Sequence, residues 1–126
     1  MLFLSGLIVG IILFQSSILA PILFKTLEIE DAGKLLRAVF PKFFILLTLI
    51  GIVSLVILLI QETESTFVHY IIVAISIIFP TICKMIIPAT NKARDDGDDT
   101  KFQKLHKISV ILTVTVLFAN IGIVFL

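Results

Sequence analysis

Four long apolar stretches constrain the fold of this chain more than any other feature of its sequence. They cover residues Met1–Phe24, Phe40–Ile60, Phe67–Ile87 and Leu105–Leu126. About 20 helical residues cross a hydrocarbon core of about 30 Å, so each stretch is long enough to span a membrane. Hydrophobic residues make up 59% of the chain, and its mean hydropathy is +1.19. We therefore expect an all-α integral membrane four-helix bundle that occupies residues 1–126 as a single domain.

All ten Lys and Arg residues fall in two regions, residues 25–42 and 84–107. Cytoplasmic loops carry the excess of Lys and Arg, so we predict that both regions are cytoplasmic and that both termini lie outside. The connection Gln61–Thr66 holds Glu62 and Glu64 but no Lys or Arg, and belongs on the side of the termini. The short loops and the lack of a basic segment before the first stretch favour a bacterial inner membrane with periplasmic termini.

The first basic region is expected to contain a short interfacial helix over approximately residues 31–39. Asp31 is suited to cap its start, and Leu35, Leu36 and Val39 give it an apolar side. Pro41 then stands where the second span could begin, because the first turn of a helix tolerates proline.

A weak internal repeat links the two halves of the chain. Pro21 precedes Lys25, and Pro80 precedes Lys84, at the same spacing near the ends of the first and third spans. This match favours two tandem helical hairpins related by an axis along the membrane normal. The alternative is that a proline and a snorkelling lysine are ordinary at the inner end of a span.

Small and polar residues form one stripe on each of three spans, at the three- and four-residue steps that keep side chains on one helix face. Such stripes favour close helix packing in membranes, and Gly6 and Gly10 form a small-xxx-small packing motif. We expect the stripes to converge inside the bundle. Their members are Gly6, Gly10, Leu13 and Ser17 on the first span, His69, Val73, Ser76, Pro80 and Cys83 on the third, and His106, Ser109, Thr113, Val116 and Asn120 on the fourth.

An alternative for some of these polar residues is a pocket in the inner half of the bundle. They lie about two or three helical turns from the cytoplasmic ends of their spans. Hydroxyl and amide groups at that depth could bind a small polar ligand or an ion. The residues of this predicted polar pocket are Gln15, Ser16, Thr48, Ser109 and Thr113.

His106 is the best single candidate for a functional side chain. It begins the stripe of the fourth span near the inner interface, where a histidine could bind a metal or a haem, or relay a proton. The alternative is an interfacial histidine bonded to a loop carbonyl or a lipid headgroup. His69 lies near the opposite interface, so the two histidines cannot bind one metal or one haem iron together.

The sequence carries no recognisable catalytic pattern, and we expect a protein that is not an enzyme. It lacks zinc-ligand spacing, a phosphate-binding glycine loop and a nucleophile elbow. The basic residues are few and alternate with acids, which argues against nucleic acid as a partner. Membrane lipid is the expected partner of these basic side chains.

Several segments, read in order, resemble the transmembrane-protein-205-like family of four-helix membrane proteins. They are Ala20–Phe24, Ala32-Gly33, Val39–Phe44, Pro80 and Phe102–Val110. The most distinctive piece is Leu105-His106 followed by Ser109, whereas Thr113 stands where many relatives carry Asn. The resemblance implies a four-helix membrane protein without a settled biochemical activity. Animal members are linked to platinum-drug resistance, which hints at transport or trafficking.

Three functions follow as hypotheses. The first is an accessory or structural subunit of a larger membrane complex, or a homo-oligomeric bundle. The second is transport or handling of a small solute or a metal through the predicted polar pocket. The third is a haem-binding redox protein with His106 as an axial ligand.

Overall fold

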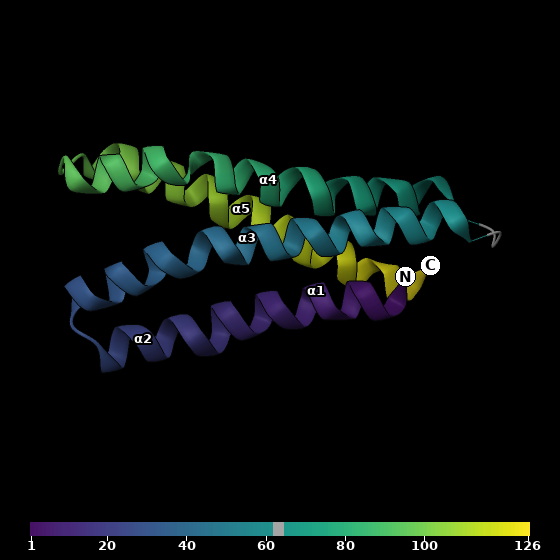
Figure 1. Ribbon diagram of the computed structural model, residues 1–126, viewed down its shortest axis with the longest axis horizontal. Coiled ribbons are helices and arrows are strands. Elements are labelled where there is room, and N and C mark those ends of the chain that lie inside the picture. The colour runs from purple at the N-terminus through teal and green to yellow at the C-terminus, as the bar shows by residue number, and fades with distance from the viewer. Residues whose placement is uncertain (62–64) are drawn as a thin grey trace.

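The chain is all-helical in the computed structural model, which describes residues 1–61 and 65–126 and contains no strand within them. Helix α1 is followed directly by a π-helical segment, η1, and by α2, so that the three form one rod (Figure 1). A short 3-10 turn, η2, ends the chain. The bounds are α1 Leu2–Phe14, η1 Gln15–Leu19, α2 Ala20–Thr26, α3 Ile29–Ile60, α4 Phe67–Asp95, α5 Asp99–Gly122 and η2 Ile123–Phe125.

Four rods in the described residues are long and apolar enough to cross a membrane, which confirms the predicted fold class. They are Leu2–Thr26, Ile29–Ile60, Phe67–Asp95 and Asp99–Phe125. Both termini lie at one end of the bundle, where α3 ends and α4 begins (Figure 1). We call this the terminal end, and we call the opposite end, which holds the turns before α3 and before α5, the basic end. Glu62 and Glu64 lie outside the described residues.

Three lysines mark how deep the bundle can sit in a bilayer. Lys42 on α3, Lys84 on α4 and Lys104 on α5 each lie 17 or 18 residues from the terminal end of their helices. At 1.5 Å per residue this distance is about 26–27 Å, close to the thickness of a hydrocarbon core. The helices therefore extend beyond the lysines at the basic end into a charged region outside the hydrocarbon.

The second span differs from its prediction at its start. Instead of a short helix over 31–39 and a separate span from residue 40, α3 runs unbroken from Ile29 to Ile60 with Pro41 inside it. Proline removes one backbone hydrogen bond and leaves the carbonyl four residues earlier without its usual donor. That carbonyl belongs to Arg37, which lies beyond Lys42 where water can reach it, so the helix continues.

The first span contains a π-helical segment that its sequence periodicity does not indicate. η1 covers Gln15–Leu19 and leads into α2, whose first turn holds Pro21. The ring of Pro21 crowds the carbonyl of Ser17, and a wider π turn is one way to accommodate such a clash. Pro80, its counterpart in the weak repeat, lies instead inside the regular helix α4. The two proline segments therefore have different local structures.

The four rods pack unequally. α3 packs along α4, and α4 along α5, whereas α1 makes fewer contacts, mostly with α5 and fewer with α3. Figure 1 shows α2 lying apart from α4 and α5 at the basic end. Of the two predicted hairpins, α4–α5 is tight and joined by a turn in which Gly97 has a φ of +71°. The hairpin of α1–α2 with α3 is open.

Ser76 on α4 is the junction of the three closely packed helices. Its backbone carbonyl lies against Gly51 of α3, where an added Cβ would be only 2.8 Å from the oxygen. Its hydroxyl accepts a 2.8 Å hydrogen bond from Asn120 Nδ2 of α5. Ser76 and Asn120 are buried, as are Val73, Pro80, Cys83 and Val116 of the same stripes. The expected convergence of the third and fourth spans is confirmed at these positions.

The stripe of small and polar residues on the first span does not face the interior of the bundle. Gly6, Gly10, Leu13 and Ser17 are all exposed in the chain. The buried positions of this rod are Ser5, Ile8, Ile12 and Gln15, together with Leu23. Ile8 and Ile12 join the apolar core with Phe43 and Leu47 of α3. The bulkier side chains thus occupy the interior and leave the glycine face open, contrary to the expectation for this span.

An ion pair links α3 to α4 in the charged region at the basic end. Arg37 donates to both carboxylate oxygens of Asp95, at 2.6 and 3.2 Å. The hydrogen bonds from Arg37 hold the pKa of Asp95 below its usual range. Both side chains are exposed, so the pair contributes little to stability.

Acidification should remove this small contribution. A carboxylate whose pKa is lowered by folding stabilises the protein above its ordinary pKa, near 4, and loses that effect as the pH falls through the folded value. We expect the melting temperature of Asp95→Asn in detergent micelles to be slightly below that of the wild type at pH 7. The difference should shrink as the pH falls below the ordinary pKa of an aspartate and through the lowered pKa of Asp95. An equal difference in melting temperature at neutral and acidic pH would contradict a stabilising ion pair between Arg37 and Asp95. Asp96→Asn, which removes a neighbouring carboxylate outside this pair, is the control.

Candidate functional site: a lateral groove between the first rod and α3

The residues of the predicted polar pocket fall into separate hydrogen-bonded groups. On α3, Thr48 donates to the carbonyl of Phe44 at 2.9 Å, and its hydroxyl lies 3.4 Å from that of Thr81 on α4. On α5, Thr113 donates to the carbonyl of Ser109 at 2.7 Å. No hydrogen bond joins these two groups to each other in the part of the chain that the structure describes.

Cys83 of α4 accompanies the α5 pair. Its Sγ lies 3.7 Å from the Ser109 carbonyl and 4.0 Å from the Thr113 hydroxyl. These contacts tie α4 to α5 where Cys83 is fully buried. Ser109 and Thr113 are therefore placed in a packed helix contact rather than on an open cavity.

Gln15 and Ser16 lie in η1, away from both groups. Ser16 Oγ donates to Gln15 Oε1 at 3.2 Å. Gln15 is only 7% exposed, and its amide nitrogen donates to no acceptor among residues 1–61 and 65–126. No buried side-chain nitrogen or oxygen of the described residues lacks a hydrogen-bond partner, so the Gln15 nitrogen reaches the accessible surface of the chain, where a molecule in the membrane can supply an acceptor.

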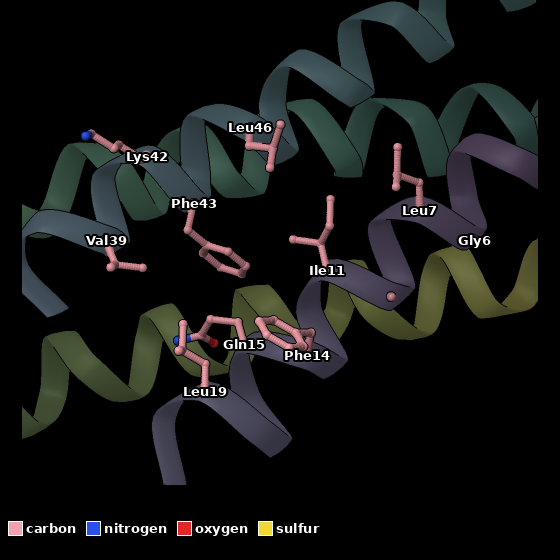
Figure 2. Close-up of a pocket in the computed structure, with 11 residues that line it drawn as sticks. Gly6, Leu7, Ile11, Phe14, Gln15, Leu19, Val39, Lys42, Phe43 and Leu46 are labelled. Atoms are coloured by element: carbon pink, nitrogen blue, oxygen red, sulfur yellow. The ribbon is translucent and has the colours of Figure 1, made fainter. Parts of the chain in front are cut away.

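Gln15 faces a groove of about 590 Å³ between the first rod and α3. Figure 2 shows its side chain extending from η1 into this space, on the side of Phe43 and Val39. We call this space the lateral groove, because it opens sideways towards lipid. It is lined by Gly6, Leu7, Gly10, Ile11, Phe14, Gln15, Leu19, Val39, Lys42, Phe43 and Leu46.

The lateral groove exists because the first rod makes few contacts with α3 and carries glycines, which have no side chains, on the side that faces the groove. A Cβ built on Gly6 or Gly10 would meet nothing within 4 Å. Phe43 and Leu46 of α3 form the facing wall (Figure 2). Apolar clefts of 300–1,000 Å³ with a few polar groups are typical of ligand sites, and the lateral groove has this composition.

Lys42 lies at the end of the lateral groove nearest the basic end. Its stem contributes to the lining, while Figure 2 shows its ammonium group turned away from the apolar interior. A lysine at this depth keeps its charge in the interfacial region and its methylene groups in hydrocarbon. The lateral groove therefore runs from a cation, past an amide, into a purely apolar segment.

His106 lies apart from the lateral groove, on the exposed side of α5. Its ring stacks on that of Phe102, with centroids 5.9 Å apart and an interplanar angle of 5°. The guanidinium of Arg94 lies 4.3 Å from the centroid of Phe102, as in a cation–π contact. Among the described residues, no three His, Cys, Asp or Glu side chains form a group that could hold a metal ion. A haem role for His106 stays a prediction, which a visible spectrum of the purified protein would test.

Sequence reasoning found Gln15 but not the lateral groove around it. Phe43 and Leu46 lie within the apolar stretch Phe40–Ile60, where nothing in the sequence distinguishes them, and Lys42 counted only as part of the basic region 25–42. Pro21 was the one sign in the sequence of an irregular helix one turn earlier. It could not indicate which residues of α3 would lie opposite.

Comparison with known families finds a match over most of the chain. The sequence model of a family described as "Domain of unknown function (DUF4149)" matches residues 3–99. The match covers the first rod, α3 and α4, and ends where α5 begins. No curated protein matches the chain, and no solved structure matches it.

Proposed function

The chain belongs to the DUF4149 family, a domain family of unknown function, and we propose that it is a non-catalytic membrane protein that binds an apolar ligand in its lateral groove. The observation that carries this proposal is Gln15, a largely buried residue whose accessible amide nitrogen has no acceptor among the described residues and which lines an apolar cleft. The open space over Gly6 and Gly10 supports it, because a ligand can lie against the backbone there.

Filling the lateral groove should weaken ligand binding several-fold without unfolding the protein. Gly10→Leu places a side chain where nothing lies within 4 Å of the added Cβ, and leucine favours a helix over glycine by about 1 kcal/mol. We expect a diazirine-bearing fatty-acyl probe to label the α1 and α3 segments of the wild type, and Gly10→Leu to reduce this labelling several-fold. Labelled peptides are identified by mass spectrometry.

The control is Ala74→Leu, which enlarges an exposed residue of α4 outside the lateral groove. It should leave labelling of α1 and α3 unchanged. Uniform labelling of all four rods, or equal labelling of the wild type and Gly10→Leu, would refute the proposed function.

The second candidate function is an accessory subunit or a homo-oligomer in which a helix of another chain occupies the lateral groove. The exposed glycines Gly6 and Gly10 favour it, because small residues let two membrane helices approach closely. Two identical grooves facing each other would leave a void between them, so a protruding helix of a different subunit fits better than the same face of a second copy. Co-purification in mild detergent that depends on Gly10 would support this candidate.

We also propose the resemblance to the transmembrane-protein-205-like family and the orientation of the bundle in the membrane. Leu105, His106 and Ser109 support membership of the transmembrane-protein-205-like group within the family. The basic residues support an orientation with the basic end in the cytoplasm of a bacterium and the termini in the periplasm. Transport of a small solute or a metal is a weaker alternative, because the hydroxyl groups of Thr48 and Thr113 donate to carbonyls of their own helices in two separate groups.

A further inference from the structure

We infer that the ligand of the lateral groove is an anionic glycerophospholipid from the leaflet at the basic end, with one acyl chain lying along α1. This inference rests on the proposed function and names the class of ligand. Its basis is the order of chemical groups along the lateral groove. From the basic end inwards, the lining offers the stem of Lys42, whose ammonium group turns away from the apolar interior, then the Gln15 amide, then apolar side chains (Figure 2). Gly10 and Gly6 are also among the lining residues.

A phospholipid presents its groups in the same order, from phosphate through ester carbonyl to hydrocarbon. The ester carbonyl is an acceptor without a donor of its own, and Gln15 Nε2 is a donor without an acceptor in the described chain. Hydrogen bonding between the two would satisfy both groups at a depth where water is scarce.

Lys42 supplies the complement to the phosphate. It lies about 27 Å from the terminal end of α3, at the level expected for a headgroup interface. A basic residue near a membrane surface attracts anionic lipid by about 1 kcal/mol. Lys42 and Gln15 lie at different positions along the lateral groove (Figure 2). A phospholipid has two separate polar groups to match them, whereas a free fatty acid has a single carboxylate.

The apolar part of the lateral groove suits a chain rather than a bulky ring system. It is lined by Gly10 and Gly6, which lie about one helical turn apart and at which an added Cβ would meet nothing within 4 Å. Ile11 and Leu46 border it (Figure 2). Its open side allows a lipid to enter from the bilayer without any part of the bundle moving.

Native mass spectrometry of the full-length protein tests this assignment. The protein is stripped of lipid, then reconstituted with equal amounts of phosphatidylglycerol and phosphatidylcholine that carry identical acyl chains. We expect one phospholipid per chain, with phosphatidylglycerol preferred. Lys42→Gln should reduce that preference about fivefold. Gln15→Leu should weaken retention of both lipids about threefold to tenfold, as expected for a membrane hydrogen bond.

Lys84→Gln is the matched control, because Lys84 lies at the same depth on α4 and does not line the lateral groove. It should leave the lipid preference unchanged, and thermal melting should verify that all three variants are folded. Equal effects of Lys42→Gln and Lys84→Gln, together with unchanged retention by Gln15→Leu, would overturn the inference. So would a retained free fatty acid, or a lipid-free dimer that Gln15→Leu dissociates.

These outcomes are distinct from a failure of the proposed function. If Gly10→Leu removes probe labelling but Gln15→Leu and Lys42→Gln bind lipid as the wild type does, the lateral groove binds an apolar ligand of another class. If Gly10→Leu leaves labelling intact, the lateral groove is not a binding site, and the inference fails with the proposed function.

Discussion

Gly51→Ala is expected to lower the free energy of unfolding by about 1–3 kcal/mol, the usual cost of forcing extra atoms into a packed contact. The added Cβ would lie 2.8 Å from the carbonyl oxygen of Ser76 and 2.9 Å from Cγ1 of Ile77. A backbone carbonyl inside a helix cannot turn aside, so α3 must move away from α4. Gly51→Val should cost more, because its two methyl groups need further space. Unfolding in mixed micelles with increasing dodecyl sulfate measures both variants.

Gly33→Ala is the matched control, since it makes the same change on the same helix. An added Cβ at Gly33 would meet nothing within 4 Å. Alanine favours a helix interior by about 1 kcal/mol over glycine, so this variant should be as stable as the wild type or more stable. If Gly51→Ala also proved neutral or stabilising, the close approach of α3 and α4 at Ser76 would be wrong.

Asn120→Ala should also destabilise the bundle, by about 1–2 kcal/mol. Asn120 is 3% exposed. Its Nδ2 donates to Ser76 Oγ at 2.8 Å and to the Val116 carbonyl at 2.9 Å. The substitution removes this hydrogen bond between α5 and α4 and leaves a small cavity. The same unfolding assay in mixed micelles measures the decrease in the free energy of unfolding.

A double-mutant cycle with Ser76→Ala isolates the interhelical bond. Coupling energies of such bonds in membrane proteins average about 0.6 kcal/mol and reach about 1.7 kcal/mol. We expect a value in that range with the sign of a favourable interaction. Thr115→Ala is the control, because the hydroxyl of Thr115 donates to the carbonyl of Ile111 within its own helix and to no other helix in residues 1–61 and 65–126. Additive losses for Asn120 and Ser76 would mean that the two side chains do not interact.

The sequence was sufficient to predict the four spans. A chain that crosses a bilayer must satisfy its backbone hydrogen bonds internally, so long apolar stretches have few alternatives to helices. The sequence was also sufficient for the buried faces of α4 and α5, where the stripes containing Ser76 and Asn120 meet. It was not sufficient for the start of α3. Pro41 is compatible with a helix start or a helix interior, and only the surroundings of the Arg37 carbonyl decide between them.

The lateral groove could not be predicted from the sequence, because no local sequence pattern determines how the first rod and α3 lie relative to each other. The π turn of η1 changes which residues of the first rod share a face, so a regular helical period misplaces Gln15 relative to Gly10. The glycine stripe indicated close packing, yet the larger side chains Ile8 and Ile12 occupy the core and turn the glycines outwards. The position of Phe43 opposite Gln15 depends on how α3 docks on α4, which involves residues far apart in the chain.

The most direct test of the central claim is a crystal structure of the full chain grown from a lipidic mesophase that contains anionic phospholipid. The account predicts a continuous acyl chain between α1 and α3 that passes Gly10 and Gly6, with an ester carbonyl within hydrogen-bonding distance of Gln15 Nε2. A first rod packed closely against α3 with no space between them would contradict it. A helix of another chain in the lateral groove would contradict it equally.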